Sequence, residues 1–334
     1  MTIHGDQRKW GRGGEEEEEG DNKLQQWIHR EKVQDIMLEQ SSRRRLMNKF
    51  ITILAISCII VAIIPLGSIL IEVVRNGISV ISTEFLTQPP GSFYLGTGGI
   101  GPAIQGTLIV IGLTSLIGAP IGVVAGIFLS EFAPVVRSGS DSGRSKWILL
   151  FHSAVRLFND VLTGLPSIVI GIVGYIVLVL TIGSFSVLAG AFSLSLIMIP
   201  IVVRVTEETL KIVPNSLREA GHSLGIPKWK IIIFIVLKSA KSGILTGIVL
   251  AIARIAGETA PLILTILGTS LFFSSLTGPV DALPLRIWRL ASQPYESAHA
   301  FGWGAALVLI LIVLGLSVSL RLLAQKRGFL LAEV

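Results

Sequence analysis

Residues 50–71 read FITILAISCIIVAIIPLGSILI, a run of 22 residues without a charged side chain. A helix rises about 1.5 Å per residue, so this run spans roughly 33 Å, enough to cross the hydrocarbon core of a bilayer. The whole chain has the same character, with 51% hydrophobic residues, 15% charged residues and a mean hydropathy of +0.73. Because a soluble domain carries about 25% charged residues, this composition excludes a soluble globular fold.

Five further apolar segments follow the first one along the chain. A more amphipathic stretch, 147–159, precedes one of them. Glycine recurs inside them, and small residues let membrane helices pack closely; examples are Gly118, Gly122 and Gly126. We therefore expect an all-α membrane protein with about six transmembrane helices, the last five covering about 103–132, 166–181, 185–203, 243–267 and 302–322.

Basic residues concentrate in alternate connections between the apolar segments. Three arginines at 43–45 and Lys49 precede the first segment, which predicts a cytoplasmic N-terminus. Six spans then place both termini on the cytoplasmic side of the plasma membrane, with Arg286 and Arg289 as a partial exception to the pattern. This placement assigns the net charge of +6 to orientation and to the headgroups of the lipid bilayer, not to nucleic acid.

Residues 1–48 differ in composition from everything that follows. They include five consecutive glutamates, residues 15–19, and such a charged block is solvated and favours disorder. We expect a partly disordered cytoplasmic extension over 1–48 and a transmembrane domain over 49–334, with its core at about 103–322.

The connection between the fourth and fifth segments predicts a short helix lying parallel to the membrane. Ser216 is a candidate N-cap with Glu219 as its reciprocal partner, and Gly225 can take the left-handed conformation that ends a helix before Pro227. The helix is either a capped surface element that ends a loop or a docking helix that enters a groove on a cytoplasmic partner. Its apolar positions share one face: Leu217, Ala220, Gly221 and Leu224.

Arg254 and Glu258 are the most distinctive chemical feature of the apolar segments. An ionisable side chain is costly inside a membrane and faces the bundle interior or water. Four residues apart, the two are expected to share a helix face and pair, either as a structural ion pair or as an arginine ready to bind an anion. Thr259 adds a hydroxyl beside them, and the helix break at Pro166-Ser167 is expected near the same pathway.

Several runs resemble the permeases of ABC importers. Glu219-Ala220-Gly221, followed by Gly225 and by Ile235-Val236-Leu237, resembles the EAA loop that docks into the ATPase subunit. Gly221 stands where that loop usually has alanine, and Lys238 where it usually has proline. The chain also resembles PstA, the type-1 permease subunit of phosphate ABC importers, in the runs GGIGPAIQGTL (98–108), PIGVVAGIFLSEF (120–132), GLPSIVIG (164–171), EETLKIVPNSLREAGHSLG (207–225) and GILTGIVLAIARIAGETAPLILT (243–265).

The resemblance implies a set of partners and a division of labour. It implies a separate ATPase subunit, a second PstC-like permease, an extracytoplasmic phosphate-binding protein and inorganic phosphate as the transported anion. The chain has no G-x-x-x-x-G-K-[ST] phosphate loop, so ATP and Mg belong to the partner ATPase. Its five histidines have no metal-ligand spacing, and no catalytic residue or cofactor site is expected.

Other functions remain open at this point. The permease could carry another oxyanion, such as molybdate or sulfate. A secondary transporter driven by an ion gradient would not need the docking helix. A membrane scaffold without transport activity would not need the Arg254 and Glu258 pair.

Overall fold

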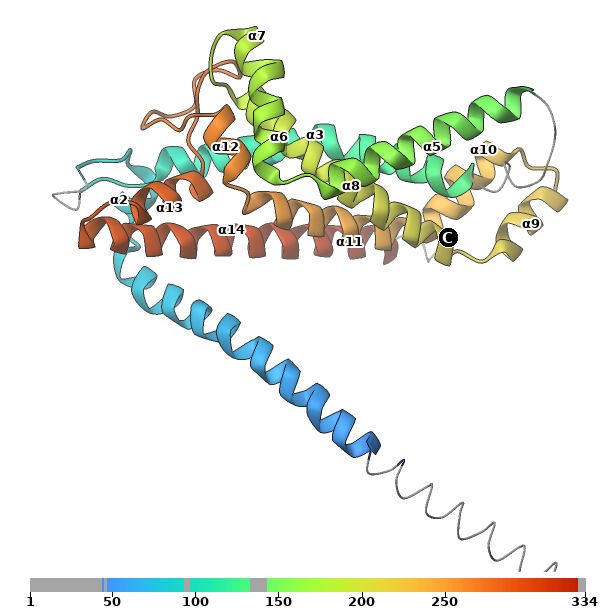
Figure 1. Cartoon of the computed structure of the whole chain (residues 1–334), viewed down its shortest axis with the longest axis horizontal. Coiled ribbons are helices and arrows are strands. Elements are labelled where there is room, and N and C mark those ends of the chain that lie inside the picture. The colour runs from blue at the N-terminus through green and yellow to red at the C-terminus, as the bar shows by residue number, and fades with distance from the viewer. Residues whose placement is uncertain (1–43, 45–46, 93–96, 133–142, 330–334) are drawn as a thin grey trace, which may run out of the picture. The chain divides into compact units, whose positions relative to one another are not determined.

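The computed structural model describes residues 44, 47–92, 97–132 and 143–329 (Figure 1). Every regular element in these ranges is a helix, which confirms the predicted all-α class. The chain divides into two compact units, Met1–Leu70 and Ile71–Val334. The predicted extension over 1–48 lies almost wholly outside the described residues, so its boundary with the transmembrane domain stays a prediction.

Five helices of the described residues are long and apolar enough to cross a membrane, and one bent helix pair can add a sixth span. The prediction of about six transmembrane helices is therefore confirmed. The first helix is Met47–Val80, whose last turn is the tighter η1, Ile78–Val80. Three of the others are α3 (Gly101–Glu131), α8 (Val187–Ile212) and α14 (Glu296–Phe329). The last is the continuous helix Lys228–Ala256, which consists of α10 (Lys228–Lys230), η3 (Ile231–Val236) and α11 (Leu237–Ala256).

The bent pair consists of α5 (Gly143–Gly164) and the helix that runs through α6 (Ser167–Gly174), η2 (Tyr175–Val179) and α7 (Leu180–Ile182). Its halves meet at an angle of 111°. The start of α5 lies near the end of α3, where His152 Nε2 is 3.3 Å from Leu129 O. The end of α8 returns to the same place, because Arg218 contacts both Glu131 and Leu210 O. Since α8 makes one crossing to return to this end, the bent pair must make the other, and it therefore crosses the bundle once, as a broken span.

The predicted start of this third span was wrong. The sequence placed the span at 166–181 and treated 147–159 as a separate amphipathic stretch, whereas the structure makes that stretch half of the crossing. The reason is that charged side chains such as Arg156 and Asp160 lower the hydropathy of α5, although both line a polar cavity between α5 and α8.

The packing of α3 against α8 forms the centre of the bundle, and α11 packs on both of these helices. Gly118, Gly122 and Gly126 lie on one face of α3, and they meet Met198, Val202 and Thr206 on α8. A Cβ added at Gly122 would lie 2.7 Å from Val202 Cβ, and one at Gly126 would lie 2.8 Å from Val203 O. The predicted packing role of these glycines is confirmed, because only glycine permits this approach.

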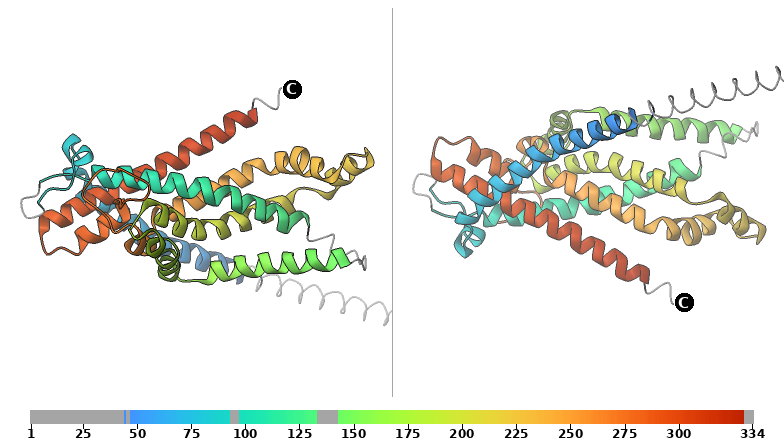
Figure 2. Two further views of the ribbon diagram at one scale, coloured as in Figure 1. Left: turned by 90° about the horizontal axis from the view of Figure 1, so that it is seen from above. Right: turned by 90° about the horizontal axis from the view of Figure 1, so that it is seen from below.

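The short elements gather at the two ends of the bundle. Figures 1 and 2 show α9 (Asn215–Ser223, yellow) at one end and α13 (Leu283–Ala291, orange-red) at the other. At the α13 end, Phe85 of α2 (Thr83–Thr87) packs into an apolar cluster with Leu283 and Leu290. At the α9 end, a second cluster includes Leu210, Ile231 and Val236. α12 (Ala260–Thr265) packs against α6.

Candidate functional site

A cavity of about 550 Å³ opens between α5, α6, α8 and α11. Four of the five residues predicted to line a pathway meet in it: Pro166, Ser167, Arg254 and Glu258. They come from two segments almost 90 residues apart in the chain, and the structure brings them together. Thr259, the fifth predicted residue, stands just before α12 and does not line the cavity.

The Arg254 and Glu258 side chains form an ion pair, but not on one continuous helix as predicted. α11 ends at Ala256, and Glu258 lies beyond it in the break before α12. The helix cannot run on because Pro261, near the start of α12, lacks an N–H and clashes with the preceding turn. Arg254 Nη1 donates to Glu258 Oε1 across this helix end.

The two members of this pair differ sharply in exposure. The Glu258 side chain is 7% exposed, whereas the Arg254 side chain is 59% exposed. In the described part of the chain, Arg254 lines the cavity and donates a hydrogen bond to protein only through Nη1. A buried carboxylate thus holds one side of a guanidinium whose remaining donors are open to a ligand.

A second arginine lines the same cavity, and the sequence reasoning missed it. Arg204 on α8 lies with its Nε 3.7 Å from Glu208 Oε1, and both side chains are about two-thirds exposed. The predicted fourth span ended at 203, which assigned these charges to a loop, but α8 continues to Ile212. The Arg-x-x-x-Glu spacing, identical to that of residues 254 and 258, was the available signal.

Polar cavities continue from this point along α8. A smaller one of about 170 Å³ shares Arg204 and Glu208 with the first cavity. It also reaches Glu207, whose Oε1 accepts hydrogen bonds of 2.7 Å from both Arg156 Nη2 and Lys211 Nζ. These three residues line a third cavity of about 910 Å³ at the α9 end of the bundle. One face of α8 therefore carries charged groups from the first cavity to α9.

The predicted docking helix is present as α9, between α8 and α10. Gly225 has a φ of +72°, as predicted for the residue that ends the helix. Gly225 N donates to His222 O at 2.9 Å and Ile226 N donates to Gly221 O at 3.1 Å, the two bonds of a Schellman motif. The following Pro227 prevents the helix from continuing.

The predicted capping box is wrong. α9 begins at Asn215 with Pro214 as the N-cap, and no side chain caps it. Pro214 adopts φ −59° and ψ 141°, so the helix starts directly after it and Ser216 falls inside the first turn. Glu219 is therefore free of the capping role and lies on the exposed side of α9.

The apolar face of α9 is open in the described residues. Leu217 is 41% exposed and Leu224 is 78% exposed, and Ala220 is also exposed. Gly221 is buried, and a Cβ at this position would lie 2.9 Å from Ile231 Cγ1. The glycine in place of the usual alanine therefore allows α9 to pack closely on η3, while Leu217 and Leu224 remain exposed.

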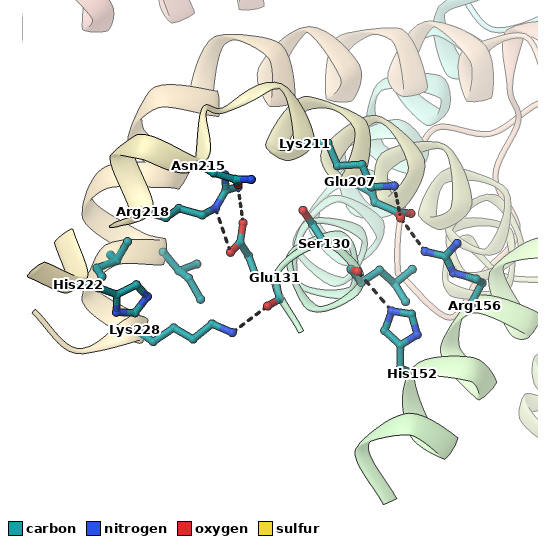
Figure 3. Close-up of a pocket in the computed structure, with 13 residues that line it drawn as sticks. Ser130, Glu131, His152, Arg156, Glu207, Lys211, Asn215, Arg218, His222 and Lys228 are labelled. Carbon is teal, nitrogen blue, oxygen red and sulfur yellow. Dashed lines mark hydrogen bonds and ion pairs between the residues drawn. The ribbon is translucent and has the colours of Figure 1, made fainter. Parts of the chain in front are cut away.

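Figure 3 shows a charged cluster in the cavity beside α9 that the sequence reasoning did not identify. Glu131, at the end of α3, lies between Arg218 of α9 and Lys228 of α10. Glu207 and Arg156 form a separate pair on the far side of the same cavity. No periodic pattern in the sequence brings together residues that lie 87 and 97 positions apart.

A buried ion pair at the opposite end of the bundle provides a contrast. Arg286 Nε donates to Asp281 Oδ2 at 2.6 Å, with side chains 4% and 0% exposed. Burial raises the pKa of Asp281 above its usual range, although Arg286 acts in the opposite direction. Asp281 Oδ1 has no hydrogen-bond partner among the described residues. Because both side chains are enclosed, this pair fixes the start of α13 and is not exposed to a ligand.

Comparison with known proteins assigns a family to these features. Residues 146–328, more than half of the chain, match the family "Binding-protein-dependent transport system inner membrane component". The phosphate transport system permease protein PstA of Yersinia pestis is 39% identical over 287 residues, covering 85% of this chain and 92% of the relative. The chain belongs to the PstA permease family. A PstA from Xylella fastidiosa strain 9a5c is 41% identical over 286 residues, covering 84% of this chain and 93% of that protein.

Two solved structures of ABC transporters have a fold similar to that of this chain. A bacterial alginate ABC transporter in complex with an alginate-bound periplasmic protein aligns with a TM-score of 0.57 at 15% identity, over 84% of this chain and 95% of that chain. The MetNI methionine ABC transporter in an inward-facing conformation aligns with a TM-score of 0.52 at 16% identity, over 67% and 95%. At these identities the likeness concerns the fold alone. The chain is thus a multi-pass membrane permease of PstA type.

Proposed function

We propose that this chain is the permease subunit of an ATP-driven importer for inorganic phosphate and forms half of its translocation pathway. The observation that carries the proposal is the cavity that combines Arg254 and Glu258 with Pro166 and Ser167. Relatives named as phosphate transport permeases, at 35–41% identity over most of the chain, support the choice of phosphate.

The asymmetry of the Arg254 and Glu258 pair suits an anion carrier. A pair that only fixes helix packing is enclosed on both sides, as Asp281 and Arg286 are. Arg254 instead presents a half-exposed guanidinium, whose planar donors match two phosphate oxygens. Glu258 holds this side chain when no anion is present, and its negative charge prevents the site from binding phosphate too tightly to release it.

Arg204 offers a second position for the anion in the same cavity. Its partner Glu208 lies at a longer distance than a hydrogen bond and both are exposed, so the guanidinium can exchange the carboxylate for phosphate at little cost. From there the polar cavities along α8 lead past Glu207 toward the α9 end. The proposed route of the anion follows this face of α8.

Energy for transport comes, in this proposal, from a separate ATPase subunit that binds ATP and Mg and receives α9 in a groove. The exposed leucines of α9 and its rigid Schellman end support this role. A second, PstC-like permease completes the pathway, and an extracytoplasmic phosphate-binding protein delivers the anion. The α9 end then lies in the cytoplasm, and we propose the same side for both termini, as the basic residues before the first span indicate.

The test is phosphate uptake by Arg254 variants at equal abundance in the membrane. Arg254→Lys should lower uptake, because an ammonium cannot reproduce the guanidinium fork. The double variant Arg254→Leu/Glu258→Leu should abolish uptake, although it removes both charges together and therefore leaves the buried Glu258 position without an unpaired charge. Arg321→Lys, at an exposed arginine that lines none of these cavities, is the matched control and should transport normally.

Near-normal uptake by the double-leucine variant would refute the pathway role and leave the pair as a packing element. Competition assays address the substrate: excess sulfate or molybdate that displaced labelled phosphate would identify a broader oxyanion carrier. Uptake that persisted after ATP depletion would identify a secondary transporter.

A further inference from the structure

Glu131, the last residue of α3, is a buried carboxylate at the wall of the cavity beside α9. Its side chain is only 7% exposed. A buried charge is costly unless it is paired and hydrogen-bonded, so its position requires compensating contacts. Both sets of contacts come from the segment that contains α9, on either side of the Gly225 turn.

Arg218 of α9 makes the first set of contacts. Its Nη2 donates to Glu131 Oε1 at 2.7 Å and its Nε donates to Oε2 at 3.4 Å, a two-point contact with the carboxylate. The same guanidinium holds the end of α8, because Nη1 donates to Val213 O at 2.6 Å and Nη2 donates to Leu210 O at 2.9 Å. Arg218 thus joins α9 to α3 and to α8 at one point.

Lys228 of α10 makes the second contact. Its Nζ donates to the main-chain oxygen of Glu131 at 2.9 Å and lies 4.8 Å from the centre of the Phe132 ring. A cation at the end of a helix is favourable, because unpaired carbonyls give that end a partial negative charge. The end of α3 is therefore held by one cation from within α9 and by another from just beyond it (Figure 3).

The hydrogen bonds of this cluster connect helices and do not form a ligand site. All three nitrogens of Arg218 already donate to protein oxygens, the fifth contact being Nη1 to Asn215 Oδ1 at 3.3 Å. The Glu131 carboxylate accepts from the same guanidinium through both oxygens. A ligand would have to break these contacts, whereas a displacement of α9 would transmit force through them.

We propose that Glu131 is a positioning residue that transmits movement of α9 to α3, and through the close packing of α3 on α8 to the whole bundle. The inference rests on the proposed function, in which α9 docks into the ATPase. Loss of the Glu131 charge leaves Arg218 bonded to Leu210 O and Val213 O, so α9 stays attached to α8 and can still dock. Only the link to α3 is weakened.

The experiment uses the assembled transporter in liposomes and measures ATP hydrolysis and phosphate uptake together. Glu131→Gln keeps the side-chain volume and removes the charge. We expect an unchanged rate of ATP hydrolysis and an uptake per ATP that falls about 2- to 30-fold, the range for residues that carry coupling between sites. Glu131→Asp, which keeps the charge, should recover part of the loss. Glu84→Gln, an exposed carboxylate at the other end of the bundle, is the control and should change neither rate.

Docking is monitored separately with a cysteine at position 224, in a chain whose native Cys58 is replaced by serine. Crosslinking of this cysteine to the ATPase should be equal in the parent and in Glu131→Gln. Unchanged uptake per ATP in Glu131→Gln would overturn the inference. A joint loss of crosslinking and hydrolysis would also overturn it, because Glu131 would then only hold α9 in place. Failure of the parent chain itself to crosslink would instead refute the proposed docking of α9.

Discussion

The glycine face of α3 permits a sharp test of the packing that organises the bundle, because the same helix offers a matched control. A Cβ at Gly122 would lie 2.7 Å from Val202 Cβ and 3.1 Å from Ile199 O, whereas a Cβ at Gly112 would meet no atom within 4 Å. Alanine in place of glycine favours a helix by about 1 kcal/mol at either position. That gain cancels in the comparison, so the difference between Gly122→Ala and Gly112→Ala measures the packing cost.

The size of the cost follows from the distances. Carbon atoms in contact prefer a separation of about 3.5–4.0 Å, so α3 and α8 would have to move apart by roughly 1 Å. Overpacking of this kind costs about 1–3 kcal/mol, and we expect Gly122→Ala to be less stable than Gly112→Ala by that amount. The assay is reversible unfolding of the purified subunit in mixed micelles. Free energies of unfolding for the two variants within about 0.5 kcal/mol of each other would refute the close approach.

The remaining predictions concern the two ends of the bundle. Glu219→Lys reverses a charge on the exposed face of α9 and should weaken assembly with the ATPase about fivefold or more. Gly225→Trp should strain the left-handed turn by about 1–2 kcal/mol. Crosslinking to the ATPase at matched abundance checks both variants, and normal crosslinking would contradict both predictions. Arg286→Met should destabilise the fold by about 3–5 kcal/mol because it leaves Asp281 buried and unpaired, while the double variant Asp281→Leu/Arg286→Met should cost far less in the same unfolding assay. Burial already raises the pKa of Asp281, and loss of the guanidinium would raise it further. The folded state would then bind a proton more tightly than the unfolded chain. The loss in free energy of unfolding caused by Arg286→Met should therefore become smaller as the pH falls from neutral.

The spans and the short helix before the fifth span were predictable because their signals are local. Hydropathy located the membrane helices, and the glycine at 225 marked the end of α9 correctly. Helix boundaries were less accurate where a charged side chain faces a cavity in place of lipid, as at Arg156 in α5 and Arg204 in α8. Hydropathy cannot distinguish these two environments, so both spans were predicted too short.

The candidate pathway was predicted in its residues but not in its geometry. Arg254 and Glu258 were expected to pair on one helix face, yet they pair across a helix end, because the proline that follows forces a break. The cluster at Glu131 could not be predicted from periodicity. Its partners are distant in sequence, and only the contacts of Arg218 and Lys228 with the end of α3 reveal why a carboxylate is tolerated there.

The glycine contact between α3 and α8 also limits how the protein can move. The glycines of α3 lie directly against the side chains of Met198, Val202 and Thr206 on α8, so neither helix can roll or slide without a clash and the two move as one rigid unit. Bending must then occur where the helices are broken, at Leu165-Pro166 and just after Ala256. Both interruptions border the cavity that holds Arg254. Spin-label distances between α3 and α8 should therefore stay constant through the ATP cycle, while the hinges flex at the cavity proposed to bind the anion.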